Sequence, residues 1–121
     1  MVHGRIDEDL KIFVPITLVA DPDIKIEALR DTGFNGEFVL SKEYAPYLEL
    51  IHVCEIESEL ADGRIIEDDL FTMAVRFNGE TKLTLASLTE SAESLVETQL
   101  LQEKQLRINF VSGEVMIEQA L

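Results

Sequence analysis

Apolar and polar residues alternate along most of this chain with the two-residue period of a β-strand. Short groups of turn-forming residues separate the alternating segments, and Asp62-Gly63 and Asn78-Gly79 are typical of tight hairpin turns. The longest predicted hairpin runs from Ile51 to Phe77. The pattern therefore predicts an all-β protein built mainly from hairpins, with the clearest strands at residues 11–20, 24–30, 70–77 and 81–88.

Helical signals are few. Ser41 can cap one helical turn that stops near Pro46. Residues 98–104 are rich in good helix formers and predict about two further turns. Strands at this close spacing favour a small barrel or a sandwich. The length predicts a single domain over residues 1–121.

The composition excludes several classes of partner. The chain has 24 acidic and 10 basic residues, a net charge of −14, whereas nucleic acids and anionic membranes bind clustered Lys and Arg. Cys54 is the only cysteine, so no disulfide forms within the chain. Neither histidine has a Cys or His at metal-ligand spacing, and we expect no metal and no cofactor. The N-terminus lacks a signal pattern and no apolar run could span a membrane, so we expect a cytoplasmic protein.

The candidate chemistry lies at Asp31-Thr32-Gly33, between two apolar, strand-like segments. A carboxylate at a Gly-bounded turn, with a Thr beside it, resembles half of an aspartic-protease site. The chain holds one copy of this triplet, so such a site would have to take its second carboxylate from another copy of the chain. The same residues also allow a purely local interpretation, an Asx turn in which Asp31 accepts nearby backbone N–H groups.

The order of these elements resembles that of the retropepsin-like, single-lobe aspartic proteases (clan AA) over nearly the whole chain. Residues 31–37, with Phe34 and Gly36, are most similar to the prokaryotic branch of that family. The other matching segments are Phe38-Val39-Leu40, the hairpin tip at residues 61–64, Asn78-Gly79, residues 95–101 and residues 106–110. The resemblance implies a closed small barrel of the acid-protease type, with one short helix in the C-terminal half.

The resemblance also implies a function. A homodimeric endopeptidase would hydrolyse a polypeptide with two copies of Asp31 that share one proton, while the hairpin near residues 57–67 closes over the substrate as a flap. Asp31, Thr32 and Gly33 would form the catalytic loop, and the Thr32 hydroxyl would reach the partner's loop. The implied substrate-binding residues are Ala28, Phe34, Ala61, Asp62, Gly63, Ile65, Ile66 and Leu95.

The resemblance predicts how two copies would associate. In the family the chain termini interleave into a shared sheet, next to the contact between the two catalytic loops. Here Val115-Met116-Ile117 is an apolar terminal strand that would otherwise be an exposed edge. We therefore expect the terminal strands and the residue 31–33 loops to form the dimer interface.

Two residues depart from the family pattern. Arg30 stands where an apolar residue usually precedes the Asp, and Glu97 stands where a Gly packs behind the catalytic loop. Because their charges are opposite and their segments should be neighbours, we predict that they form an ion pair. The alternative is that both side chains point into solvent.

These departures keep a second function open. A retropepsin-fold dimer with impaired catalysis could bind peptides or serve as an assembly module, since a cation next to Asp31 opposes the sharing of a proton. A third interpretation is a small β-barrel that is unrelated to proteases.

Overall fold

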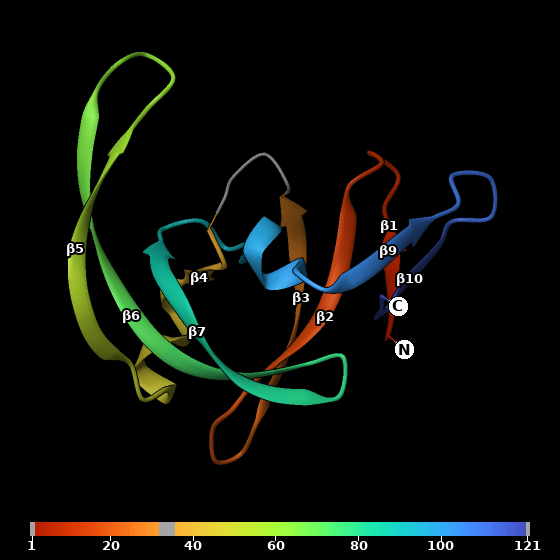
Figure 1. Cartoon of the computed structure of the whole chain (residues 1–121), viewed down its shortest axis with the longest axis horizontal. Coiled ribbons are helices and arrows are strands. Elements are labelled where there is room, and N and C mark those ends of the chain that lie inside the picture. Colours follow the sequence, from red (N-terminus) through yellow and green to blue (C-terminus); the bar gives the residue numbers. More distant parts are fainter. Residues whose placement is uncertain (1, 32–35, 121) are drawn as a thin grey trace.

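A computed structural model describes residues 2–31 and 36–120 of the chain. These residues form ten strands of one mixed sheet and two short 3-10 helices (Figure 1). Neither helix is long and apolar enough to cross a membrane. In chain order the elements are β1 (Val2–Ile6), β2 (Ile12–Leu18), β3 (Ile24–Asp31), β4 (Phe38–Ser41), η1 (Lys42–Tyr47), β5 (Ile51–Glu59), β6 (Ile65–Phe77), β7 (Glu80–Thr89), β8 (Leu95–Glu97), η2 (Thr98–Leu101), β9 (Lys104–Ile108) and β10 (Glu114–Gln119).

The sheet closes on itself through one additional pairing. The strand order is β5-β6-β7-β4-β8-β3-β2-β1-β10-β9, and β6 also pairs with β2. The strands from β6 through β7, β4, β8 and β3 to β2 therefore form a ring (Figure 1), from which β5 and the β1-β10-β9 group extend. This arrangement confirms the predicted all-β barrel.

The core lies inside this ring and follows the two-residue period of the strands. β2 contributes Val14, Ile16 and Leu18, and β6 contributes Met73 and its next two inward-facing neighbours, Val75 and Phe77. Each of these side chains is at most 2% exposed. Burial of one such side chain stabilises the fold by about 1.5–3 kcal/mol relative to exposure, so the alternating pattern accounts for the closure of the ring.

Two predicted hairpin turns have the backbone that their residues favour. Asn78 and Gly79, between β6 and β7, have φ angles of 52° and 79°. Positive φ at both central residues is the geometry of a two-residue turn that matches the strand twist. At the β5–β6 tip, Gly63 has a φ of 86°, and the Leu60 N–H donates to the Arg64 carbonyl at 2.7 Å.

Pro15 lies within β2, at a position where its lack of a backbone N–H removes no hydrogen bond between strands. On one edge of β2 it pairs with Glu27 of β3. On the other edge, β1 reaches only to Phe13 and β6 reaches only to Thr17. Pro15 therefore occupies the gap between two partner strands, which is where a strand tolerates a proline.

The helical predictions need correction. The prediction of two turns over residues 98–104 is wrong, because η2 is a single 3-10 turn that ends at Leu101. Glu103 then takes a φ of 66°, which ends helical structure, and Lys104 begins β9 by pairing with Gln119. Strand pairing overrides the local helix propensity here. η1 does form, but the Ser41 side chain makes no capping hydrogen bond.

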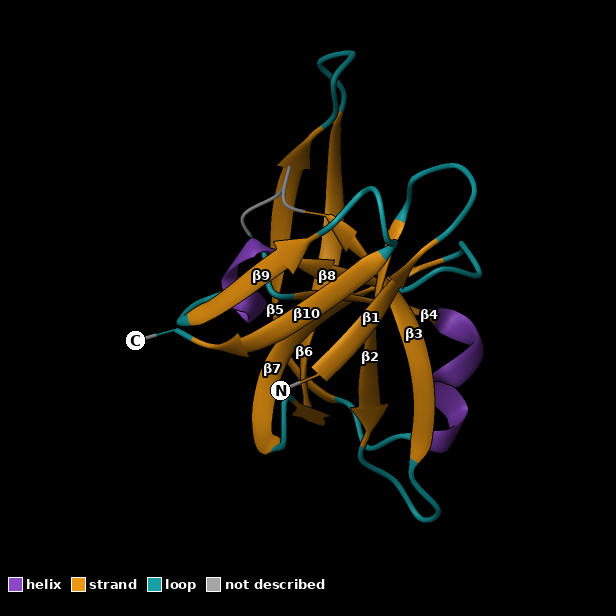
Figure 2. Cartoon of the chain, turned by 90° about the vertical axis from the view of Figure 1, so that its right-hand side faces the viewer, coloured by secondary structure: helices purple, strands orange, loops and turns teal. Residues whose placement is uncertain are grey.

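The terminal strands also differ from the prediction. Figure 2 shows β9, β10, β1 and β2 side by side in one layer. β10 pairs with β1 on one edge and with β9 on the other, and Val115 and Ile117 are at most 1% exposed. The expectation that Val115-Met116-Ile117 would otherwise be an exposed edge is therefore wrong. The chain's own N-terminal strand covers that edge, and β9 is the outer strand of this group.

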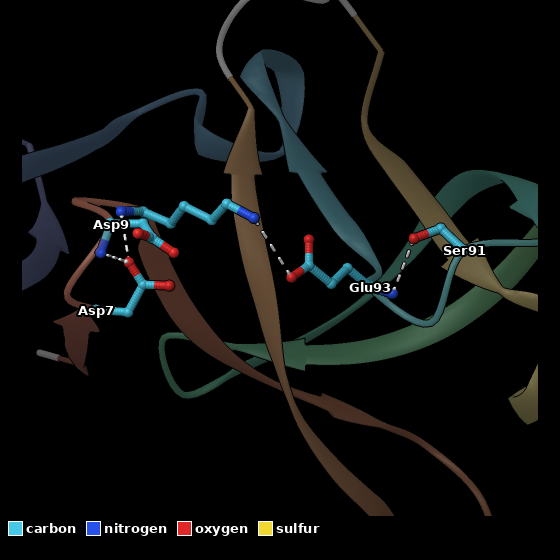
Figure 3. A network of polar contacts seen from close by, with 5 residues as sticks. Asp7, Asp9, Ser91 and Glu93 are labelled. Atoms are coloured by element: carbon cyan, nitrogen blue, oxygen red, sulfur yellow. Dashed lines mark hydrogen bonds and ion pairs between the residues drawn. The ribbon is translucent and has the colours of Figure 1, made fainter.

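The acidic segment between β1 and β2 forms a turn held by its own side chain. The Asp7 carboxylate accepts the N–H groups of Asp9 and Lys11 at 3.0 and 2.8 Å (Figure 3). The Lys11 ammonium lies 3.9 Å from the Glu93 carboxylate, which joins this turn to the loop before β8. Asp7 and Glu93 thus take part in the structure of two surface loops.

Candidate active site

The short strand β8 contacts the chain on both sides of the candidate catalytic loop. It pairs with β3, which ends at Asp31, and it contacts the segment that begins at Gly36 and continues into β4. β8 lies between β3 and β4, parallel to the first and antiparallel to the second. The Glu97 N–H donates to the Glu37 carbonyl at 2.9 Å, and the Gln99 N–H donates to the Gly36 carbonyl at 2.9 Å. Asp31 is therefore the last residue of a strand whose direction is set by a neighbour from the C-terminal half.

Ser94 strengthens this arrangement and was missed by the sequence interpretation. Its carbonyl accepts the Leu29 N–H at 2.8 Å, and its hydroxyl oxygen accepts the Ser41 N–H at 2.9 Å. Ser94 is 2% exposed. A buried serine with both groups bonded ties β3 and β4 to the start of β8. The surrounding polar residues resemble an ordinary loop, so the sequence contains little signal for this role.

Asp31 and Glu97 are direct partners across the parallel β3–β8 pair. Side chains of directly paired residues point to the same face of a sheet. Asp31 is half-buried, and Glu97 is 9% exposed. Burial raises the pKa of the Glu97 carboxyl above its ordinary value of 4.5, and the nearby charge of Asp31 raises it further. Each chain therefore places two carboxyl groups at this end of the sheet.

Gly36 makes room for the Glu97 side chain. A Cβ atom at Gly36 would lie 2.1 Å from Oε1 of Glu97. Among the described residues, leaving aside the chain neighbours of Gly36, the other atom within 4 Å of that position is the Glu97 Cδ, at 3.3 Å. The absence of a side chain at residue 36 thus matches the presence of a long one at residue 97.

The predicted ion pair between Arg30 and Glu97 is wrong. Arg30 pairs with Val96, so its side chain points to the face opposite Asp31 and Glu97. The Arg30 Nε is buried and has no hydrogen-bond partner among residues 2–31 and 36–120. The two departures from the family pattern lie on neighbouring segments, as expected, but one register position apart and therefore on different faces.

A cleft of about 810 Å³ lies between the β5–β6 hairpin and the chain that follows the loop. Glu97, Leu95 and Val39 line it on the sheet side. On the hairpin side its lining includes Ile56, Ser58, Leu60, Ile66, Asp68 and Leu70. Its volume falls within the range of ligand-binding sites in proteins, and its walls are mostly apolar with a few carboxylates.

Glu37 fixes the wall of the cleft just after the loop. Its carboxylate accepts the Thr84 hydroxyl at 3.3 Å and the Leu85 N–H at 3.4 Å. Both partners belong to β7, so the carboxylate links the segment just before β4 to a neighbouring strand of the ring. Glu37 was part of the sequence resemblance, but this role was not anticipated.

The predicted substrate-binding residues fall into three groups. Ile66 and Leu95 line the cleft. Ala28 does not, because it faces inward from β3 and is fully buried in the core. Ile65 and the tip residues Ala61, Asp62 and Gly63 are exposed and are not among the described residues that line the cleft. Thr32, Gly33 and Phe34 lie outside the described residues.

Strand alternation explains which hairpin residues were missed. Ile66, Asp68 and Leu70 share one face of β6 and line the cleft, whereas Ile65 belongs to the opposite face and is 66% exposed. Because adjacent residues of a strand face opposite sides, Ile65 and Ile66 could not both line one cleft. In the sequence, the two-residue period counted onward from Ile66 would have identified Asp68 and Leu70 as the other β6 residues of the cleft wall.

No group of three or more His, Cys, Asp or Glu side chains within residues 2–31 and 36–120 is arranged to hold a metal ion. His52 instead accompanies Asp69 on the exposed side of the hairpin, with 2.9 Å between Nε2 and Oδ1.

Comparisons with known proteins agree with this architecture. No protein-family model matches the sequence, and curated proteins give no match. Among solved structures, the chain is similar to the crystal structure of a retropepsin-like aspartic protease from Rickettsia conorii, with a TM-score of 0.59. This chain has the retropepsin-like fold. The match covers 99% of this chain and 92% of the other at 17% identity, so it confirms the predicted resemblance at the level of the fold.

Proposed function

We propose that this protein is a homodimeric aspartic endopeptidase whose reacting pair is Asp31 from each of two copies. The proposal rests above all on one observation. In a retropepsin-like fold, Asp31 ends the strand that β8 aligns, and its direct pairing partner Glu97 lines a large cleft. A single chain contributes one such aspartate, and a two-fold axis at the loop would bring two together.

The chemistry follows from two like charges held close together. They cannot both ionise easily, so the pair retains one proton over a range of pH. The ionised Asp31 takes a proton from a water molecule, which attacks the scissile carbonyl carbon. The protonated Asp31 donates a hydrogen bond to the carbonyl oxygen and later supplies the proton that the leaving amine needs.

The cleft suits an extended peptide. Strand β6 offers a row of alternate side chains along one wall, and Val39 and Leu95 provide apolar surface on the other. An extended substrate would align with such walls and place alternate side chains into them. The β5–β6 hairpin would act as the flap, with the face that carries Ile66 and Leu70 toward the substrate.

The test is cleavage of an unfolded protein at mildly acidic pH, with and without pepstatin. Replacement Asp31→Asn removes one carboxylate from each subunit, and we expect it to lower the rate by about 10³-fold or more. Asp9→Asn is the matched control, since Asp9 is exposed at the β1–β2 turn. Cleavage that survives Asp31→Asn would rule out the proposed reacting pair.

The dimer can be tested separately by sedimentation over a range of concentrations. Deletion of residues 114–121 is not a clean test, because it removes an interior strand and would unfold the sheet. A protein that stays monomeric at the concentrations where it cleaves substrate would contradict the proposed assembly.

A second candidate function is peptide binding or assembly by a dimer without catalysis. The buried Glu97 beside Asp31 favours it, because an additional carboxyl group changes how protons are shared at the reacting pair. A verified dimer that binds unfolded peptide but cleaves none at any pH would support this function over proteolysis.

A further inference from the structure

We propose that Glu97 is a positioning residue of the active centre, and that its carboxylate makes the two Asp31 groups keep their shared proton to higher pH. The inference rests on the proposed function. It gives the dimer four carboxyl groups at one centre, two from each subunit, and predicts a pH range of activity that extends further toward neutral pH.

The geometry ties Glu97 to the reacting residue. Glu97 is the direct partner of Asp31 across β3 and β8, whose chains lie about 4.8 Å apart as neighbouring strands do. Its side chain lies against Gly36, the residue where the chain leaves the loop. It also lines the cleft. Glu97 is therefore held between the entry of the loop, its exit and the substrate site.

The surroundings of Glu97 leave Asp31 as its main charged neighbour. From the β4 side, the Glu37 carboxylate is turned toward Thr84 and Leu85 of β7. η2 contributes the uncharged Gln99 to the cleft. Arg30 of β3 points to the other face.

Across the cleft the hairpin presents Asp68. Among the described residues of the lining, Lys42 is the one basic side chain, and its ammonium binds the Glu90 carboxylate at 2.5 Å. No cation in this lining is therefore available to neutralise Glu97, and its charge acts on Asp31.

The direction of the effect follows from electrostatics. When Glu97 is ionised, loss of the last proton from the Asp31 pair would place more negative charges in one partly buried site. That loss is therefore postponed to higher pH. Protons leave such a cluster in steps that belong to the cluster as a whole, so the effect should appear in the alkaline limb of the rate profile.

The first experiment compares the pH dependence of kcat/KM for the wild type and Glu97→Gln, which keeps the shape and removes the charge. We expect the alkaline limb of Glu97→Gln to move to lower pH by about half a unit or more, with a smaller change at the acid limb. Glu8→Gln makes the same change in net charge at an exposed turn outside the cleft lining, and should leave the profile unchanged.

Two results of this experiment would overturn the inference. Superimposable profiles for the wild type and Glu97→Gln would show that the Glu97 charge does not act on the pair. Loss of activity at every pH, as deep as in Asp31→Asn, would make Glu97 a reacting group rather than a positioning one.

The second experiment needs no activity and separates this inference from the proposed function. The carboxyl carbon of Glu97 is titrated by NMR in the wild type and in Asp31→Asn. We expect Glu97 to ionise at lower pH once the charge of residue 31 is removed. An unchanged titration would overturn the coupling even in an active protease, and a changed one would support it even in a protein that cleaves nothing.

Discussion

The two faces of the β3-β8-β4 segment have opposite roles. Toward the cleft, β8 presents Leu95 and Glu97, and β4 presents Val39. Toward the ring, the same two strands bury Val96 and Phe38 at no more than 2% exposure. Each site residue is thus the sequence neighbour of a core residue. Since strand side chains alternate, the same hydrogen-bonded backbone directs one set of side chains into the core and the other set toward the cleft.

The two charged residues that depart from the family pattern, Glu97 and Arg30, lie on opposite faces and differ in how they respond to burial. Glu97, on the cleft face, has a raised pKa and so carries less charge at a given pH than a solvated glutamate. Arg30, on the ring side, cannot respond in this way, because a guanidinium stays charged. Its Nε is instead buried without a hydrogen-bond partner in the part of the chain that the structure describes. The cleft face therefore accommodates a titratable group, whereas the ring face holds a permanent cation with one buried, unsatisfied donor among the described residues.

The largest expected contrast comes from two identical substitutions on opposite faces. Val96→Ala should lower the free energy of unfolding by about 2–3 kcal/mol, through lost burial and a cavity in the ring. Val39→Ala should lower it by less than about 1 kcal/mol and should mainly weaken substrate binding. Urea denaturation measures both. Equal losses for the two variants would show that the faces are not energetically distinct.

A smaller effect is expected for Gly36→Ala, whose change in the free energy of unfolding should have opposite signs in two backgrounds. In the wild type, Gly36→Ala forces the Glu97 carboxyl to move and should cost about 1–2 kcal/mol. A Glu97→Gly background removes both described atoms that the added Cβ would meet, Oε1 and Cδ of Glu97. There the same substitution should stabilise the protein by about 0.4–1 kcal/mol, through the unfolded state.

This double-mutant cycle measures the fit between residues 36 and 97 directly. The same sign for Gly36→Ala in both backgrounds would contradict the close contact between Gly36 and the Glu97 side chain.

Removal of the Arg30 side chain, which is partly exposed but has a buried Nε, should have a modest, favourable effect. Arg30→Met keeps the length of the side chain and eliminates an unsatisfied donor, so unfolding should cost about 1 kcal/mol more. Arg64→Met, at the exposed hairpin tip, is the control and should stay within about 0.5 kcal/mol. Marked destabilisation by Arg30→Met would mean that the guanidinium has a partner in the assembled protein.

The smallest expected effect is a dependence of stability on pH. The folded state raises the pKa of Glu97, so it binds more protons than the unfolded chain between 4.5 and that raised value. The stabilisation from neutral Glu97 is complete below 4.5 and is lost as the pH rises through the folded pKa. Denaturation at about pH 4 and about pH 8 should show a smaller loss in Glu97→Gln than in the wild type. Parallel losses in the two proteins would refute this linkage.

Local pattern in the sequence determined the elements and the motif. Alternating residues predicted the strands, and Asn78-Gly79 predicted a turn whose two positive φ angles the structure confirms. The position of Asp31 after a strand was also readable, and with the family resemblance it led to the correct fold. These features depend on residues close together in the chain, for which propensity and period are sufficient.

The tertiary structure alone decided how distant segments align. The sequence placed Arg30, Asp31 and Glu97 on neighbouring strands, but only the register showed that Glu97 pairs with Asp31 and not with Arg30. A shift of one residue would have reversed every side chain of β8 between the cleft and the ring. Likewise, only the assembled sheet showed that β1 covers β10. Register between distant strands is set by how all of them pack at once, and no local stretch of residues encodes it.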